Sequence, residues 1–372
     1  MTCRPALLLG VIYMCLIYSP VSTGPDDLIN TYHPNCLFNV TSFSQNFIDN
    51  FNHQPNTKIF GDSGGLQFFK SRIGMIKRRY LVVPFRQIRH HKDKSAISPA
   101  ALCERYREID VKFGFTLDSP VSYDASDIEY LYNLERSYEW AKLMLISRDK
   151  ICPKTELFIP LHYCDKLQLH TYFDKMSDLN PNGFAFPSGN KSDLYWTIRT
   201  ACTLCFLSMK QVKKVHMLGS SKREVIVMGG AVLSMGMFDH VSFDSKTWNT
   251  KIHNPQPICI HPKTLTQRKL KPDFELNEVP KTGSFEHWMK QHPSLYQYDN
   301  IKLLMLNNAF AISQYAATLA EASKTINQLK DYLPNLALRG QSKDRALLGI
   351  KIIEKYKKKG YCYIEKWLSW TW

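Results

Sequence analysis

Short apolar runs alternate with longer amphipathic stretches along most of the chain. The apolar runs have strand length and usually end in Asp, Gly or Pro; they cover residues 5–18, 56–62, 79–85, 112–118, 156–163, 182–187, 213–219 and 238–244. The amphipathic stretches that predict helices cover residues 98–111, 127–149, 193–212 and 223–236. Repeated strand–helix–strand order indicates a parallel sheet. About eight repeats favour an α/β fold of the closed (β/α)8 TIM-like barrel type, with an open doubly wound sheet as the alternative.

The alternating pattern stops near residue 255. A Pro-rich, basic segment follows, and after it come a long helical run at 298–333 and a basic helical run at 344–367. We therefore expect three parts: the barrel at 1–254, an inserted basic subdomain at 255–295, and C-terminal helices packed on the barrel at 296–372.

Of the composition, only the net charge indicates a class of partner. The 372 residues are 44% hydrophobic, which is enough for a sizeable core. Lys and Arg number 48 against 33 Asp and Glu, giving a formal charge of +15, and this excess favours a polyanion as partner. The ten cysteines have no regular spacing, which is typical of a reduced, cytoplasmic protein.

The N-terminal segment allows two interpretations. Residues 1–24 carry one Arg, an apolar run and then small residues, as a secretory signal does. The run is rich in Ile, Val, Tyr and Leu, however, and the following Pro-Val-Ser-Thr-Gly makes a poor cleavage site. We favour a first barrel strand and a cytoplasmic protein without a membrane partner, since the run is too short for a membrane span. The alternative is a secreted barrel that acts on glycosides.

Three acids follow predicted strands, at the end of a barrel where chemistry gathers. They are Asp62, Asp118 and Asp239. A single acid in such a place is most often a helix cap or turn residue. Three on one barrel mouth suggest more, because one carboxylate can attack a sugar carbon while a second exchanges protons with the leaving and entering groups.

The stretch around Asp62, Phe-Gly-Asp-Ser-Gly-Gly-Leu-Gln-Phe-Phe at 60–69, carries a resemblance. It resembles the Asp-Ser-Gly-Gly-aromatic-Gln motif of the tRNA-guanine transglycosylases, zinc-containing barrels that replace guanine with a 7-deazaguanine. Residues 97–120 and 216–243 are similar to two further segments of that family, in the same order. As architecture the similarity covers roughly residues 55–310, but it is specific only in these patches.

The resemblance implies roles for the matching residues. Asp239 would be the nucleophile, Asp62 the general acid/base, and Asp118 the acceptor of hydrogen bonds from the base. The residues implied to surround the base are Ser63, Gly64, Gly65, Gln67 and His162. His162 takes the place of the family's Gln-Gly, so base recognition is expected to differ. A turn that satisfies its own polar groups is the alternative for Ser63 and Gln67.

The chemistry needs no cofactor, but the family also binds a structural zinc ion through three cysteines and a histidine. This chain keeps one Cys/His pair in that region and has two histidines downstream; the candidate ligands are Cys259, His261, His287 and His292. Sulfur and imidazole ligands suit zinc, so the inserted segment is a possible degenerate zinc subdomain. Surface positions or nucleic-acid contacts are the alternative for the histidines.

Residues 70–94 follow the Asp-Ser-Gly-Gly turn and hold nine Lys or Arg against one acid. A solvated loop is the usual meaning of such a run, but beside a barrel mouth it would suit contacts with phosphates. The basic residues expected to bind nucleic acid are Lys70, Arg72, Lys77, Arg78, Arg79, Arg86 and Arg89.

The resemblance implies a pentosyltransferase that exchanges guanine in DNA for a free base such as 7-cyano-7-deazaguanine, through a covalent Asp-glycosyl intermediate. The resemblance is greatest to the DNA-modifying paralogues, often encoded by phages or in defence islands, which act in the cytoplasm of the bacterial host. A tRNA-modifying enzyme is the first alternative. A non-catalytic, nucleic-acid-binding subunit that needs a companion protein is the second, although Asp62 and Asp239 argue against it.

Overall fold

The structure is a computed structural model of the 372-residue chain. It describes residues 15–22, 27–40, 46, 51, 57–63, 98–120, 125–188, 194–249, 256–322, 324–336, 338 and 340–368.

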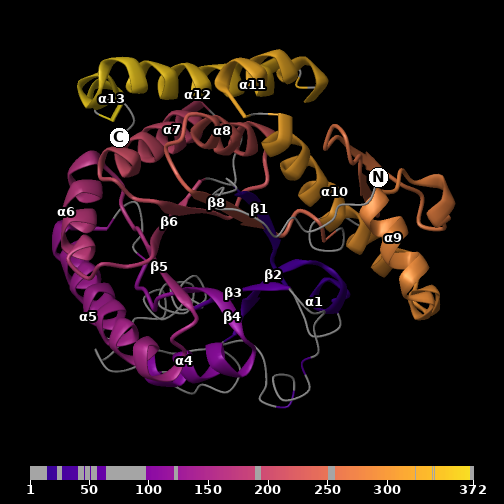
Figure 1. The fold of residues 1–372 in the computed structure, drawn as a ribbon, viewed down its shortest axis with the longest axis horizontal. Coiled ribbons are helices and arrows are strands. Elements are labelled where there is room, and N and C mark those ends of the chain that lie inside the picture. The colour runs from indigo at the N-terminus through magenta and orange to yellow at the C-terminus, as the bar shows by residue number, and fades with distance from the viewer. Residues whose placement is uncertain are drawn as a thin grey trace, which may run out of the picture.

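Eight parallel strands form a barrel at the centre of the molecule (Figure 1). They are β1 (Cys15–Pro20), β2 (Asn35–Asn39), β3 (Lys58–Asp62), β4 (Val111–Phe115), β5 (Glu156–Pro160), β6 (Gly183–Pro187), β7 (Lys214–Leu218) and β8 (His240–Ser245). The sheet runs in the order β1-β8-β7-β6-β5-β4-β3-β2. Val21 pairs with Leu37 across the remaining gap between β1 and β2. The predicted (β/α)8 barrel is confirmed.

Seven of the eight strands overlap the apolar runs that predicted them, to within one or two residues at their ends. The exception is β2, whose short segment Asn-Cys-Leu-Phe-Asn was not predicted as a strand. The apolar run at 79–85, which was, lies outside the described residues. The first strand begins at Cys15, inside the predicted run 5–18.

Helices alternate with the strands and surround the barrel (Figure 1). They are α4 (Pro99–Glu108), α5 (Asp127–Ile151), α6 (Lys166–Ser177), α7 (Leu194–Met209) and α8 (Arg223–Ser234), with the single turn α1 (Ile29–Tyr32) before β2. The start of α4 is the one expected from sequence: Ser98 accepts a hydrogen bond from Ala101 N, and Pro99 occupies the first turn. No amphipathic stretch in the sequence predicted α6.

Aromatic and aliphatic side chains fill the barrel interior. The cluster consists of Ile17, Val21, Leu37, Phe60, Phe113, Phe115, Phe158 and Ala185. Two histidines extend this packing along the barrel: the ring centroid of His216 lies 4.8 Å from that of Phe115, and that of His240 lies 4.9 Å from that of Phe113. The interior is therefore a packed apolar core in which two histidine rings are also packed.

Tyr106 of α4 fixes the ends of β3 and β4. Its ring lies against two glycines, and a Cβ atom would approach the ring to 2.5 Å at Gly61 and to 2.4 Å at Gly114. Its hydroxyl lies 2.8 Å from Gly61 O and 2.7 Å from Phe115 O. Only glycine leaves room for this ring, so these two positions are sterically specified.

The segment after the barrel strands packs back onto the barrel. It contains β9 (Ile258–Ile260), β10 (Gln267–Lys269), α9 (Gly283–Gln291), α10 (Asn300–Ala322), α11 (Ile326–Tyr332), α12 (Gly340–Lys359) and α13 (Tyr361–Leu368), with short 3₁₀ turns at Leu276–Glu278, Pro293–Gln297 and Leu333–Leu336. Helix α10 contacts β1 and α8, and α12 lies across the outer side of α7 and α8 (Figure 1).

Two buried asparagines in the apolar helix α10 attach the inserted segment to the rest of the molecule. Asn308 accepts a hydrogen bond from Ile260 N and donates one to Ile258 O, both at 2.8 Å. Asn307 accepts from Thr282 N at 3.1 Å and donates to Pro280 O at 3.0 Å. Each side-chain amide thus satisfies one donor and one acceptor of a buried backbone.

No helix in the described part of the chain is long and apolar enough to cross a membrane.

Candidate active site

Polar side chains occupy the barrel interior at the carboxyl ends of several strands. Side chains alternate along a strand, so the residues two positions beyond the apolar interior cluster also face inward. By this alternation the inward-facing polar residues are Ser19 of β1, Asn39 of β2 and Asp62 of β3. Asp244 of β8 lies on the same face of its strand as His240, whose ring packs against Phe113 inside the barrel. Strand pairing sets Ser19 beside Asp244, and Asn39 beside Asp62. This end of the barrel therefore offers two carboxylates to a ligand.

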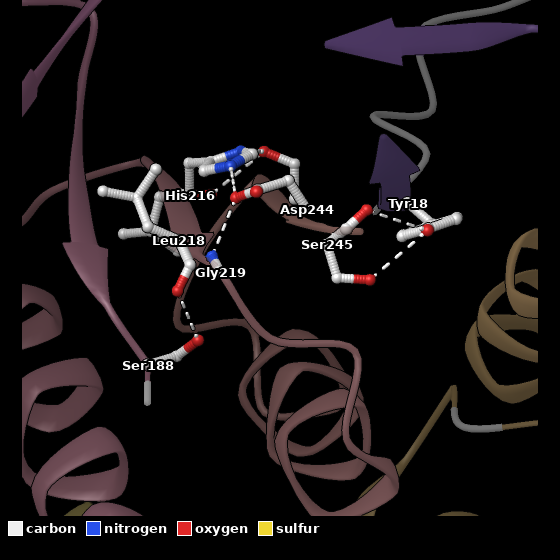
Figure 2. Close-up of polar contacts among 9 residues, drawn as sticks. Tyr18, Ser188, His216, Leu218, Gly219, Asp244 and Ser245 are labelled. Atoms are coloured by element: carbon white, nitrogen blue, oxygen red, sulfur yellow. Dashed lines mark hydrogen bonds and ion pairs between the residues drawn. The ribbon is translucent and has the colours of Figure 1, made fainter. Parts of the chain in front are cut away.

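Asp244 is held by two donors on the same oxygen (Figure 2). His216 Nε2 lies 2.9 Å from Asp244 Oδ1, and Gly219 N donates to that oxygen at 3.0 Å. Gly219 has a φ of +77°, a conformation that favours glycine and that aims its N–H at the carboxylate. Within the described part of the chain, Oδ2 of Asp244 accepts no hydrogen bond.

The hydrogen-bond partners of His216 fix the orientation of its ring. A carboxylate only accepts, so Nε2 carries the proton that is donated to Asp244. Ser242 Oγ lies 2.8 Å from the other ring nitrogen, Nδ1, and its hydroxyl donates to Val215 O at 3.5 Å. With both ring nitrogens bonded and the residue fully buried, His216 has one orientation. It holds Asp244 as part of a rigid unit.

A second carboxylate–histidine pair lies at the ends of β4 and β5. Asp118 follows β4, and its two oxygens have different partners: Ser63 Oγ donates to Oδ1 at 3.0 Å, and His162 Nε2 lies 2.6 Å from Oδ2. The side chain of His162 is 14% exposed. These contacts bring Ser63, Asp118 and His162 together, and their role beside a base stays a prediction.

The order of these three groups excludes a serine-hydrolase arrangement. A nucleophilic serine requires a histidine within hydrogen-bond reach to take its proton, with the carboxylate behind the histidine. Here Asp118 lies between Ser63 and His162. Ser63 therefore orients the carboxylate and is not activated by this histidine.

Asp62 is the last residue of β3 and is half-buried. It lies one residue beyond Gly61, whose carbonyl is bonded by Tyr106, so α4 determines where this carboxylate stands. Burial raises the pKa of the Tyr106 phenol well above its usual value, and the charge of Asp62 adds to that rise. Tyr106 thus remains a neutral hydroxyl at the base of the site.

The predicted position of Asp239 at the mouth is wrong. Asp239 precedes β8, is exposed, and donates its backbone N–H to Lys213 O, which precedes β7. It therefore lies at the amino ends of the strands, opposite the mouth. Its neighbour His240 faces the barrel interior near the amino ends of the strands, where burial lowers the pKa of the imidazole to about 3.

The sequence contained a signal for the aspartate of β8 that lies at the mouth. The run 238–244 has an aspartate near each end, and a strand that begins at the first of them directs the second to the mouth. Asp244 and His216 were both missed as site residues, although both lie in runs that were predicted as strands.

Several predicted site residues lie outside the described residues. They are Gly64, Gly65 and Gln67 of the turn, and the basic residues Lys70, Arg72, Lys77, Arg78, Arg79, Arg86 and Arg89.

The four candidate zinc ligands do not form a metal site. The described residues include no group of three or more His, Cys, Asp or Glu side chains able to hold a metal ion. Cys259 is buried in an apolar cluster with Leu270 and Phe274. His292 stacks on Trp288, His287 is exposed, and Nδ1 of His261 accepts from Lys263 N.

Comparison with models of known protein families and with curated protein sequences finds no match to this chain. The assignment of a function therefore rests on the residues and their geometry.

Proposed function

We propose that this protein is a transglycosylase that exchanges guanine in a nucleic acid for a free 7-deazaguanine base such as 7-cyano-7-deazaguanine. The nucleophile is Asp244, in place of the Asp239 that the sequence suggested. Sequence features favour DNA as the polymer, with tRNA as the alternative. The proposal rests on the resemblance of residues 60–69 and on one structural observation, the state of Asp244 at the mouth.

Asp244 has the geometry of a prepared nucleophile. Its Oδ1 is held by His216 and Gly219, whereas its Oδ2 accepts no hydrogen bond in the described part of the chain. The two donors stabilise the anion and prevent rotation, so little reorganisation is needed during the reaction. A covalent intermediate divides one difficult substitution into two easier ones.

The exchange is written as two substitutions at the sugar carbon C1′. In the first, Oδ2 of Asp244 forms a C–O bond as the bond to guanine N9 breaks; the electron pair goes to the purine, which takes a proton from Asp62. In the second, the incoming base gives its N9 proton to Asp62, its nitrogen attacks C1′, and Asp244 is released. Two inversions retain the configuration, as in retaining glycosidases.

Asp118 and His162 are assigned to the base. Both oxygens of Asp118 already accept one hydrogen bond, so this carboxylate is less suited than Asp244 to attack carbon. Each oxygen keeps a further lone pair, and a guanine-like edge offers N–H donors. His162 borders the same place and replaces an amide that the resembling family uses there.

The test is release of labelled guanine from duplex DNA and, separately, from tRNA, each with 7-cyano-7-deazaguanine. The unaltered protein is compared with Asp244→Ala and with Asp239→Ala as the matched control. We expect release to be lost with Asp244→Ala and kept with Asp239→Ala, and a glycosyl adduct on Asp244 to be found by mass spectrometry after acid quenching.

Two results would contradict parts of this proposal. Loss with Asp239→Ala alone would return the nucleophile to Asp239. Release from neither polymer would contradict the enzyme assignment and favour a nucleic-acid-binding subunit with a companion protein.

A further inference from the structure

Ser19 stands beside the proposed nucleophile. It lies in β1 and pairs in register with Asp244 of β8, and adjacent strands are about 4.8 Å apart. Ile17 and Val21, which lie two positions before and after Ser19 in the chain, belong to the apolar cluster inside the barrel. The side chain of Ser19 therefore faces the interior, on the same side of the sheet as that of Asp244.

The Ser19 hydroxyl is fully buried and has no hydrogen-bond partner in the described part of the chain. The outward-facing side chains next to it do have hydrogen-bond partners. Tyr18 Oη lies 3.3 Å from Ser245 O and 3.4 Å from Ser245 Oγ (Figure 2). A buried hydroxyl without a partner destabilises a fold, and an alanine or valine would fill the position without that penalty. A ligand bound at this end of the barrel would supply the missing partner.

The groups that lack partners here are complementary. Ser19 offers a donor, and Oδ2 of Asp244 offers an acceptor that is also unused within the described residues. A ligand atom that accepts from the first and donates to the second satisfies both, and this is what a hydroxyl group does. In a nucleotide the hydroxyl next to the carbon under attack is the 2′-OH, which RNA has and DNA lacks.

We infer that Ser19 is a specificity-determining residue that hydrogen-bonds the 2′-hydroxyl of the nucleotide whose base is exchanged. In retaining glycosidases the hydroxyl next to the reacting carbon makes hydrogen bonds that strengthen in the transition state. The inference rests on the proposed function and on Asp244 as its nucleophile. It favours RNA, the alternative polymer, over the DNA that the sequence suggested.

The experiment compares two tRNA transcripts of the same sequence, one carrying labelled guanosine and the other labelled 2′-deoxyguanosine at every G. Guanine release is measured with 7-cyano-7-deazaguanine for the unaltered chain, for Ser19→Ala, and for Ser245→Ala, which removes a buried serine from the outward face of the neighbouring strand. We expect at least about tenfold faster release from the ribose transcript, and a ratio near one for Ser19→Ala, because a lost hydrogen bond of about 1.4 kcal/mol is a tenfold change. Ser245→Ala should keep the ratio.

Thermal unfolding provides a readout that is independent of turnover. Ser19→Ala removes a hydroxyl that bonds nothing in the described chain, so its unfolding midpoint should equal or exceed that of the unaltered protein. Ser245→Ala removes the contacts of Ser245 Oγ with Tyr18, Ser221 and Thr247 and should lower the midpoint.

Equal release from both transcripts by the unaltered chain, or an unchanged ratio with Ser19→Ala, would overturn the inference and leave the proposed function standing. A clear drop in the unfolding midpoint of Ser19→Ala would also overturn it, by revealing an internal partner. Release from neither transcript, nor from DNA, would overturn the proposed function itself and this inference with it.

Discussion

Two carboxylate–histidine pairs stand at the same end of one barrel, yet their hydrogen bonds differ. At β7 and β8, both donors bind one oxygen of Asp244, and the histidine behind it is completely buried. At β4 and β5, the two oxygens of Asp118 share their donors equally, and His162 is partly exposed. The first arrangement leaves one oxygen available for chemistry; the second holds both oxygens in place as acceptors. In the proposed function, this difference in the distribution of donors is what makes Asp244 the nucleophile and Asp118 the acceptor for the base.

The largest expected effect tests this difference at the carboxylates themselves. Asp244→Asn keeps the shape of the side chain but removes the attacking anion, so the rate of guanine release should fall by about 10⁴-fold or more. Asp118→Asn should slow release by about 10²-fold, because it misplaces the base without removing the nucleophile. Single-turnover kinetics with labelled substrate measure both rates. Equal decreases in the rate of guanine release in the two variants would contradict the different roles proposed for the two pairs.

The histidines should give the next largest effect. His216→Leu removes a donor that holds Asp244, and we expect kcat to fall by about 10²- to 10³-fold. His216→Gln places an amide donor near the position of Nε2 and should restore part of that loss. His162→Leu should raise KM more than it lowers kcat, since His162 borders the base.

Steady-state kinetics separate these parameters, and thermal unfolding controls for damage to the core at His216. A failure of glutamine to restore activity in a folded protein would argue against the positioning role of His216.

The smallest expected effect concerns the packing at the end of β3, next to Asp62 and Ser63. Gly61→Ala would bring a Cβ to 2.5 Å from the Tyr106 ring, and overpacking of this kind destabilises a fold by about 1–3 kcal/mol. Gly283→Ala is the matched control, because no atom lies within 4 Å of the Cβ position there.

Denaturant unfolding measures the free-energy differences. A Gly61→Ala protein as stable as Gly283→Ala would show that α4 can shift, and Tyr106 would then not determine the position of the β3 end.

Local patterns predicted much of the fold for identifiable reasons. The cap at Ser98 and the proline after it set the start of α4, and the apolar runs set seven strands, because capping and burial act over a few neighbouring residues. The strand β2 was not predicted because its five residues begin and end in asparagine. The two asparagines of α10 also had no local explanation, since their partners lie in β9 and in the segment before α9.

The sequence by itself determined the alternation of strands and helices, the barrel, and the presence of carboxylates at strand ends near Asp62 and Asp118. The tertiary structure alone decided which aspartate of the run 238–244 faces the mouth, and that His216 and Ser19 flank it. The physical reason is that alternation along a strand distinguishes its two faces but not the residue at which the strand begins. Strand register, which brings together residues 28 and 225 positions apart in the chain, depends on packing of the whole barrel.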